Sequence, residues 1–221
     1  MKLAIALATL LSLASPVRAQ TLLPLRTVDG SVITSKNDPA AQIAVPPTAT
    51  YVGAVRFVLY GTANCEIHLF AEADSSKRVR RLYWVQFEEY LPEHPTLKYL
   101  PTPSYSVLEM SGLHFYQRAR FGKSSDLPRT GSDTEQVYLL LKANGYTFPA
   151  ETVNVTYKHF FAEMRKELLL MVIEDMSMLG ITFAELVQGG AVQPSWTPIA
   201  EQLMARASKV FSVKEQPSGS K

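Results

Sequence analysis

The stretch ANCEIHLFAE, residues 63–72, alternates between two kinds of side chain. Its odd-numbered members are small or aliphatic, whereas its even-numbered members, apart from Phe70, are polar. A period of two is typical of a strand with one buried face. The runs on either side, residues 51–60 and 78–90, alternate in the same way. We therefore expect an antiparallel sheet to begin here, with the odd-numbered members of residues 63–72 in the core.

The turns between these three runs predict the register of the strands. A three-residue loop at 61–63 would pair Arg56 with His68, and a turn at 74–77 would set His68 opposite Trp84. Glu66 and Gln86 would then lie one pair away on the same polar face. The opposite, core face would hold Val55, Phe57, Leu59, Cys65, Ile67, Leu69, Tyr83, Val85 and Phe87.

Turn signals predict two further hairpins. An Asp-Gly pair at 29–30 suits a tight turn near the N-terminus, and Ser111-Gly112 separates residues 106–110 from residues 113–121. Residues 36–50 contain three prolines and are expected to be extended, and the four prolines of residues 91–104 indicate a loop.

Capping signals predict helices in the second half of the chain. Ser132 with Glu135 forms a capping box, as does Thr182 with Glu185, so helices are expected to follow both. Thr197-Pro198 is typical of a third helix start. Apolar residues recur at helical spacing over 149–177, which predicts one long amphipathic helix, or two with a break near residue 162.

Strands first and helices after predict an α+β fold. We expect an N-terminal antiparallel sheet of meander and hairpin strands, covered on one face by C-terminal helices. The expected organisation is a signal peptide over 1–19, a lead-in over 20–50, a single domain over 51–213 and a tail over 214–221. Within the domain, the sheet is expected in 51–121 and the helices in 132–213.

Residues 1–19 have the three parts of a secretory signal peptide. The start is positive, residues 3–14 form an apolar run too short for a comfortable membrane span, and Val17-Arg18-Ala19 offers small residues for cleavage. No later apolar run reaches spanning length. Cys65 is the only cysteine, whereas secreted eukaryotic domains usually hold several. We therefore expect the protein to be located in the periplasm of a bacterium or to be secreted by the bacterium.

Charge and cysteine content exclude some functions. Cleavage after Ala19 would remove two basic residues and no acidic one, which leaves 20 of each and no net charge. Nucleic acid binding needs a basic surface, so no nucleic acid partner is expected. Cys65 shares the phase of Ile67 and Leu69 and is expected to be buried and unreactive.

No stretch carries a catalytic, phosphate-binding or metal-binding motif. The four histidines are widely separated, so neither a metal nor another cofactor is expected. The only catalytic candidates lie on the polar face, where His68 with Glu66 and Arg56 could act as a general base or bind an anion. Cross-strand charge pairing on an ordinary solvent-facing sheet is the alternative interpretation of these residues.

Aromatic residues gather in the sheet half of the chain, and some fall on its polar face. An aromatic surface with a few polar groups is how small apolar ligands are held. The candidate ligand-binding residues are Tyr60, Phe70, Trp84, Gln86 and Tyr116. Stabilisation of cross-strand pairs is the alternative use of the same aromatics.

Three functions stay open from sequence alone. The first is a non-catalytic envelope protein that binds a small or apolar ligand, or a protein partner, on the aromatic-rich sheet. The second is a periplasmic hydrolase or isomerase that uses His68, Glu66 and Arg56. The third is an envelope accessory factor that docks through its N-terminal segment and a sheet edge.

Export with cleavage after Ala19 predicts a mature chain that begins at Gln20, with cleavage after Ala14 as the alternative. N-terminal sequencing or the intact mass of the periplasmic fraction checks this. A cytosolic chain that keeps Met1 would rule it out.

Overall fold

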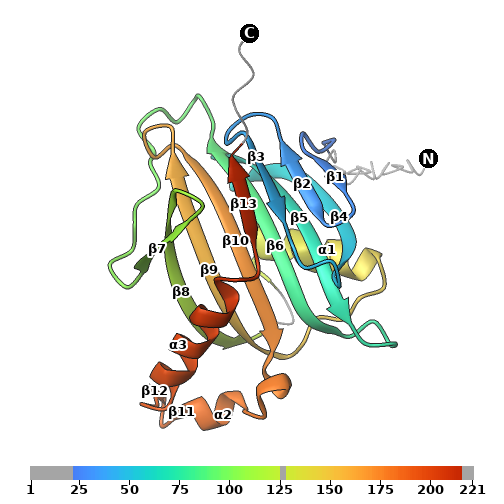
Figure 1. Ribbon diagram of the computed structural model, residues 1–221, viewed down its shortest axis with the longest axis vertical. Coiled ribbons are helices and arrows are strands. Elements are labelled where there is room, and N and C mark those ends of the chain that lie inside the picture. The colour runs from blue at the N-terminus through green and yellow to red at the C-terminus, as the bar shows by residue number, and fades with distance from the viewer. Residues whose placement is uncertain (1–21, 125–127, 216–221) are drawn as a thin grey trace, which may run out of the picture.

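The computed structural model describes residues 22–124 and 128–215 (Figure 1). The predicted signal peptide and the last six residues lie outside this part of the chain. The structure is mostly antiparallel sheet with few helices, so the fold is α+β or mainly β.

The larger sheet is antiparallel throughout. Its strand order in the described residues is β4 (Thr50–Leu59), β5 (Ala63–Ala73), β6 (Val79–Tyr90), β10 (Lys166–Asp175), β9 (Glu151–Phe161), β8 (Leu113–Lys123) and β7 (Ser106–Met110). The predicted hairpin of β7 and β8 around Ser111-Gly112 is confirmed, and both turn residues have positive φ.

A smaller sheet lies against one face of the larger one (Figure 1). Its strand order is β1 (Thr27–Asp29), β2 (Val32–Ser35), β3 (Ala41–Ala44) and β13 (Ser212–Glu215). The hairpin predicted at Asp29-Gly30 is confirmed as β1 and β2. Strand β13 pairs with β3, with Val213 opposite Ile43, so the C-terminal end of the described chain completes the N-terminal sheet. The two ends of the described part of the chain thus fold as one layer.

The helices divide between the two faces of the larger sheet. Helix α1 (Asp133–Ala143) packs against β4 and β5, behind the sheet in Figure 1. Helix α3 (Trp196–Ala207) packs against β8 and β9 on the same face as the smaller sheet. The expectation that helices cover one face alone therefore differs from the observed packing.

The helix starts follow the predicted capping residues. The Ser132 hydroxyl accepts a hydrogen bond from the Glu135 N–H at the start of α1. Thr182 and Glu185 form a complete capping box for the short helix α2 (Phe183–Leu186). Between β10 and α2 lies the 3₁₀ helix η1 (Met176–Leu179), and after α2 comes the small hairpin of β11 (Val187–Gln188) and β12 (Ala191–Val192).

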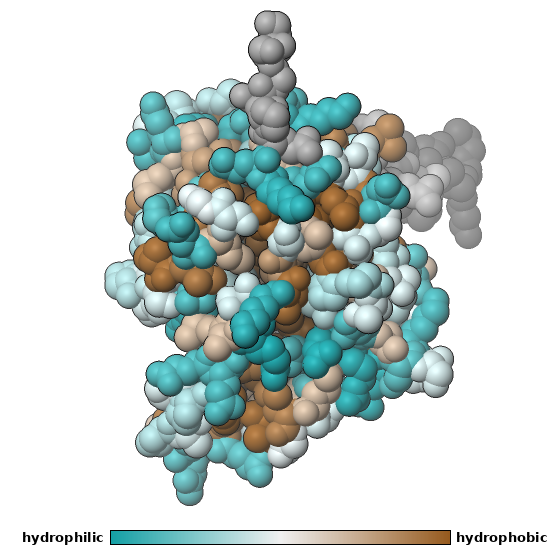
Figure 2. Space-filling view, viewed as in Figure 1, coloured by the Kyte–Doolittle hydropathy of each residue, from teal (hydrophilic) through white to brown (hydrophobic). Residues whose placement is uncertain are grey.

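Hydrophobic side chains gather over the end of the molecule where α2 and α3 lie (Figure 2). Leu179, Phe183 and Ile199 are partly buried there against the core. No helix in residues 22–124 and 128–215 is long and apolar enough to cross a membrane.

Two hydrophobic cores result, one on each face of the larger sheet. The first core lies between this sheet, the smaller sheet and α3, and it contains Phe70, Val85 and Phe115. The second lies between the sheet and α1, and it contains Cys65 and Ile67. The burial predicted for Cys65 is confirmed, since the residue is 1% exposed and burial raises the pKa of its thiol.

The strand registers differ from the predicted ones. Arg56 pairs with Glu66, not with His68, and Trp84 pairs with Leu69, not with His68. The β4–β5 register is shifted by two residues, so each side chain stays on its predicted face. The β5–β6 register is shifted by one residue, which moves Trp84 to the face opposite His68. Alternation could not set the register of β5 and β6, because both of their faces are buried.

The predicted core face is accordingly divided. Its β5 members, Cys65, Ile67 and Leu69, face α1. Its β6 members, Tyr83, Val85 and Phe87, face the smaller sheet.

The long helix predicted over 149–177 is wrong. These residues form the hairpin of β9 and β10. Strand β10 lies in the middle of the sheet with both faces covered, so its apolar run from Leu168 to Ile173 has no alternation. A strand of this kind cannot be told from a buried helix by periodicity.

Candidate functional site

The predicted catalytic residues Glu66 and His68 lie on β5 beneath the smaller sheet, and both side chains are buried. The Glu66 carboxylate accepts hydrogen bonds from the backbone N–H groups of Leu25 (2.8 Å) and Arg26 (3.0 Å). It also accepts from Arg26 Nη1 (3.4 Å) and His68 Nε2 (2.9 Å). Two donors reach each oxygen, which fills the acceptor positions of a carboxylate.

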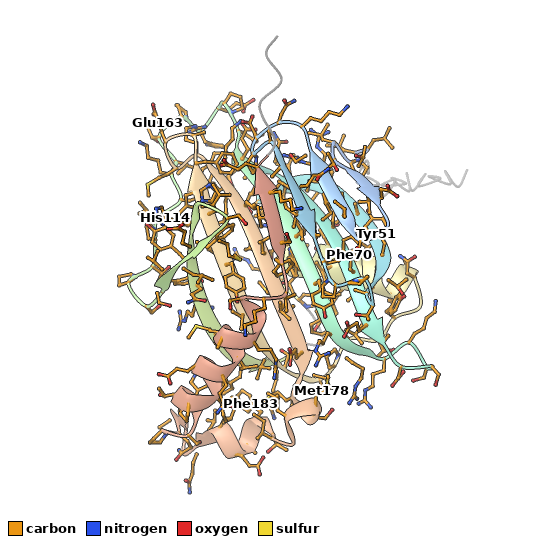
Figure 3. The ribbon with its side chains drawn as sticks, in the orientation of Figure 1. Tyr51, Phe70, His114, Glu163, Met178 and Phe183 are labelled. Carbon is orange, nitrogen blue, oxygen red and sulfur yellow. The ribbon has the colours of Figure 1, made fainter. Side chains whose placement is uncertain are left out.

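His68 is engaged on both ring nitrogens. Because a carboxylate only accepts, the proton between His68 and Glu66 belongs to Nε2. The hydroxyl of Tyr51 lies 3.2 Å from Nδ1, and the His68 ring is 0% exposed. Tyr51 lies beside Phe70 with ring centroids 4.9 Å apart, which covers this side of the cluster (Figure 3). Neither nitrogen of His68 is open to an incoming molecule.

We call Leu25, Arg26, Glu66 and His68 the N-terminal clamp. The Arg26 guanidinium lies 4.1 Å from the ring centroid of Phe87, so the clamp ties the segment before β1 to the larger sheet. Burial alone would raise the pKa of Glu66, but the hydrogen bonds from His68, Leu25 and Arg26, with the charge of Arg26, lower it to about 2. The clamp therefore holds a charged carboxylate at any physiological pH.

The row predicted from Arg56, His68 and Trp84 does not form. Arg56 lies on the same face as Glu66, whereas Trp84 lies on the α1 face with Gln86. The Trp84 indole N–H donates to the Gln86 side-chain oxygen at 2.8 Å.

The other predicted ligand residues are scattered. Tyr116 is on the α1 face and contacts Phe160, with ring centroids 5.4 Å apart. Phe70 is 0% exposed in the opposite core. Tyr60 is exposed in the turn after β4, where the Arg129 guanidinium lies 4.7 Å from its ring centroid. Three of the five predicted ligand residues, Trp84, Gln86 and Tyr116, thus share one face.

That face contains the largest hollow among the best-defined cavities of the described chain. We call it the groove: it lies between α1 and strands β8, β9 and β10, and its volume is about 600 Å³. Trp84, Leu169 and Met171 form an apolar part of its floor. A volume of about 300 to 1,000 Å³ is usual for small-molecule sites.

Polar side chains of β9 form the rest of the floor. Thr152, Asn154, Thr156 and Lys158 alternate along the strand and all line the groove. The side chains of Thr152, Asn154 and Thr156 make no hydrogen bond with any described residue, although Thr152 is 8% and Thr156 6% exposed. Among the described residues the buried side-chain atom without a hydrogen-bond partner is Gln117 Oε1, so the polar atoms of these three side chains are open to the groove and available to a molecule within it.

Arg120 stands beside this row. It lies opposite Asn154 in the pairing of β8 with β9, lines the groove and has no ion pair or hydrogen bond with the described residues. The other two cations of the wall have partners: Lys123 pairs with Glu151 and Lys158 with Glu167. Asp133 is the acidic residue of the wall. Asp133 bonds to Thr134 and forms no ion pair with a described residue, so Arg120 and Asp133 are the two charged wall residues without an ion partner in this part of the chain.

An acidic pair, a buried Glu167 and a half-buried Glu88, lies at one end of the same face. Glu88 and Glu167 are directly opposite in the pairing of β6 with β10. Lys158 Nζ donates to both oxygens of Glu167, at 3.0 and 3.2 Å. Burial raises the pKa of Glu167 to about 7, because the opposing charge of Lys158 offsets it only in part and Glu88 adds to it.

Glu88 is held by the loop that leads to β7. Gln86 Nε2 and the Tyr99 hydroxyl donate to its two oxygens at 2.6 and 2.7 Å. Burial raises the pKa of Glu88 despite these bonds. The Tyr99 ring stacks on Tyr90, with centroids 4.3 Å apart. This closes the acidic end of the α1 face.

Arg165 fixes this loop to the turn between β9 and β10. Its guanidinium donates to four backbone carbonyl oxygens, those of Tyr90, Leu91, His94 and Leu97. The position of the loop and of the groove wall therefore depends on the β9–β10 hairpin, which the sequence pattern did not predict.

Sequence reasoning did not select Arg120, Lys158, Glu167 or the polar row of β9 as candidate site residues. A signal for that row was present: the run TVNVTYK, residues 152–158, alternates polar and apolar side chains without a fault. Its helical interpretation concealed this period of two. No local sequence pattern marks Arg120 or Glu167 as a site residue. The residues around each of them come from strands that are distant in the sequence.

The described residues contain no group of three or more histidine, cysteine, aspartate or glutamate side chains placed to hold a metal ion. Comparison with protein families, curated proteins and solved structures gives no match.

Replacing Glu66 by Gln is expected to destabilise the fold by about 2–4 kcal/mol, because buried donors lose their charged acceptor. The Glu66 contribution is fully present above the ordinary glutamate pKa of about 4.5 and is lost as pH falls through about 2, since folding lowers this pKa. Urea unfolding between these pH values should show the loss in the parent chain and not in Glu66→Gln.

Glu109→Gln is the matched control, because Glu109 is exposed on the edge strand β7 and has no ion pair with a described residue. Equal destabilisation by both substitutions would contradict the clamp.

Proposed function

We propose that the protein is an exported, non-catalytic binding protein of the bacterial envelope, and that the groove holds a small amphipathic anion. The observation that carries this proposal is the row of neutral polar side chains on β9 beside Arg120, none of which is bonded to a side chain in residues 22–124 and 128–215. A site with an apolar floor, hydrogen-bonding groups and an arginine matches a ligand with an apolar body and an anionic group.

The apolar part of the ligand would lie on Trp84, Leu169 and Met171. Tyr105 and Phe148 also line the groove, so aromatic contact is available from more than one side. A small set of aromatic and aliphatic side chains is the usual support for a ligand body of this size.

The anionic part would bind Arg120. A guanidinium forms two parallel hydrogen bonds with a carboxylate, sulfonate or phosphate. Asn154 lies directly opposite on β9, with Thr152 and Thr156 two residues to either side on the same face. These groups supply further donors within the reach of one small molecule.

An enzyme that uses His68, Glu66 and Arg56 is the second candidate, and the geometry favours it less. The His68 ring is buried with both nitrogens bonded, and Glu66 accepts four hydrogen bonds. A general base needs an open position within hydrogen-bonding distance of the substrate. The clamp would have to open before these residues could act.

Dye binding tests the groove. The fluorescent anion 8-anilinonaphthalene-1-sulfonate is expected to bind and to receive energy from Trp84 in a Trp196→Phe background, where Trp84 is the one remaining tryptophan. Arg120→Gln should weaken this binding about tenfold, since a charge-assisted hydrogen bond contributes about 1.5 kcal/mol. N-phenyl-1-naphthylamine has the same aromatic body without the sulfonate and should bind Arg120→Gln and the parent chain alike.

Arg78→Gln is the matched control, because Arg78 is exposed in the turn between β5 and β6 and has no ion pair with a described residue. Absence of energy transfer from Trp84, or equal effects of Arg78→Gln and Arg120→Gln, would end the proposal.

The affinity of the groove for the sulfonate dye is expected to rise as pH falls through about 7. Below this pH Glu167 takes up a proton, so Lys158 loses its charged partner and the wall gains one positive charge. At an effective dielectric constant of about 20, one charge about 10 Å from the sulfonate contributes about 1.7 kcal/mol, so the gain should approach tenfold. Titrations at about pH 6 and about pH 8 measure it.

Glu167→Gln is neutral at both pH values, so it should bind the dye with the low-pH affinity throughout. Arg120→Gln should bind more weakly but keep the pH dependence. If Glu167→Gln kept the full pH dependence, Glu167 would not be its source.

A further inference from the structure

A second cavity lies on the opposite face of the larger sheet. We call it the N-terminal cavity: its volume is about 380 Å³, and it opens between residues 25–38 and the neighbouring ends of β4, β5, β6 and β10. Arg26, Lys36, Arg56, Asn64, Glu66 and Lys166 are among its lining residues. The larger sheet separates it from the groove, so it is a separate space.

The acidic side chains of this cavity have their own partners. Glu66 accepts the four hydrogen bonds of the N-terminal clamp. Asp38 and Glu89 both pair with Lys166. The Glu88 side chain lies on the α1 face, where Gln86 and Tyr99 bind it. No carboxylate of the lining forms an ion pair with Arg56 in the described residues.

Arg56 is a cation of the lining that has no partner among the described residues. It lies directly opposite Glu66 in the pairing of β4 with β5, yet Glu66 has no acceptor position free for it. Within the described residues Arg56 makes no ion pair or hydrogen bond. Burial lowers the pKa of Arg26, and the charge of Arg56 adds to that effect, so the two guanidiniums lie within electrostatic range of each other.

The groups around Arg56 have the right chemistry for an anion. Lys36 and the Asn64 amide also line the cavity, and neither side chain is bonded to a described residue. Arginine binds carboxylate and phosphate with two parallel hydrogen bonds, and an ammonium and an amide supply further donors.

We propose that the N-terminal cavity binds the carboxylate or phosphate group of a small anion through Arg56. Glu66 lies opposite Arg56 but binds Arg26, His68 and the backbone of residues 25–26. The bound anion would supply the negative charge that Arg56 does not receive from Glu66. This site is independent of the ligand proposed for the groove, because the two lie on opposite faces of the sheet.

Isothermal titration of the full mature chain with inorganic phosphate and, separately, with succinate tests the site. At least one anion is expected to bind saturably, and Arg56→Gln should weaken that binding at least tenfold. Arg56→Lys keeps the charge without the paired donors and should fall between the two. Arg56 is partly exposed near a sheet edge, so circular dichroism should show that both variants are folded.

Arg78→Gln removes the same charge at the other end of β5, outside both cavities, and should leave anion binding unchanged. The anion that binds more tightly identifies the source of the group, phosphate or carboxylate. Absence of saturable binding by both anions, binding that survives Arg56→Gln, or equal weakening by Arg78→Gln would overturn the site.

Discussion

Both faces of the larger sheet are covered, and this constraint governs every polar residue within its central strands. Glu66 and His68 on one face, and Gln86, Glu88 and Glu167 on the other, cannot reach bulk water freely. A polar group removed from water costs free energy unless it is bonded. Each of these side chains accordingly has a partner, and those partners decide which parts of the molecule are held together.

The two faces meet this constraint in different ways. On the face of the smaller sheet, Glu66 draws the backbone of residues 25–26 and the Arg26 side chain onto β5, so the polar cluster is closed and serves the fold. On the α1 face, the cluster of Glu88 and Glu167 closes one end alone, and the unbonded side chains of β9 extend beyond it into the groove. The closed cluster around Glu66 stabilises the fold, whereas the open polar row of β9 is available for binding.

Charge pairing explains why the exposed cations of the two cavities matter. Glu66 is engaged by other donors, so Arg56 has no ion pair within the part of the chain that the structure describes, and Arg120 has no carboxylate opposite it on β9. The sequence has nearly equal numbers of acidic and basic residues, so no excess of charge predicts either arginine. The residues opposite them in the sheet, a saturated Glu66 and a neutral Asn154, leave both arginines without an ion pair in the described residues, and net charge does not.

Local signals in the sequence determined much of the fold. The alternation of residues 63–72, the hairpin turns at residues 29–30 and 111–112, and the capping residues Ser132 and Thr182 all act over a few residues, and the structure follows them. The burial of Cys65 followed from the same alternation. Such features depend on backbone geometry and neighbouring side chains, so they can be recognised without knowledge of the rest of the chain.

The tertiary structure alone decided the strand registers, the β9–β10 hairpin and both cavities. Because β5, β6 and β10 are buried on two faces, hydrophobicity marks neither face as the inner one, and a shift by one residue costs little until the layers are packed. That shift separated Trp84 from His68 and placed it with Met171 on the groove floor. The residues that line both cavities come from strands far apart in sequence, so their association depends on pairing and packing that no local pattern contains.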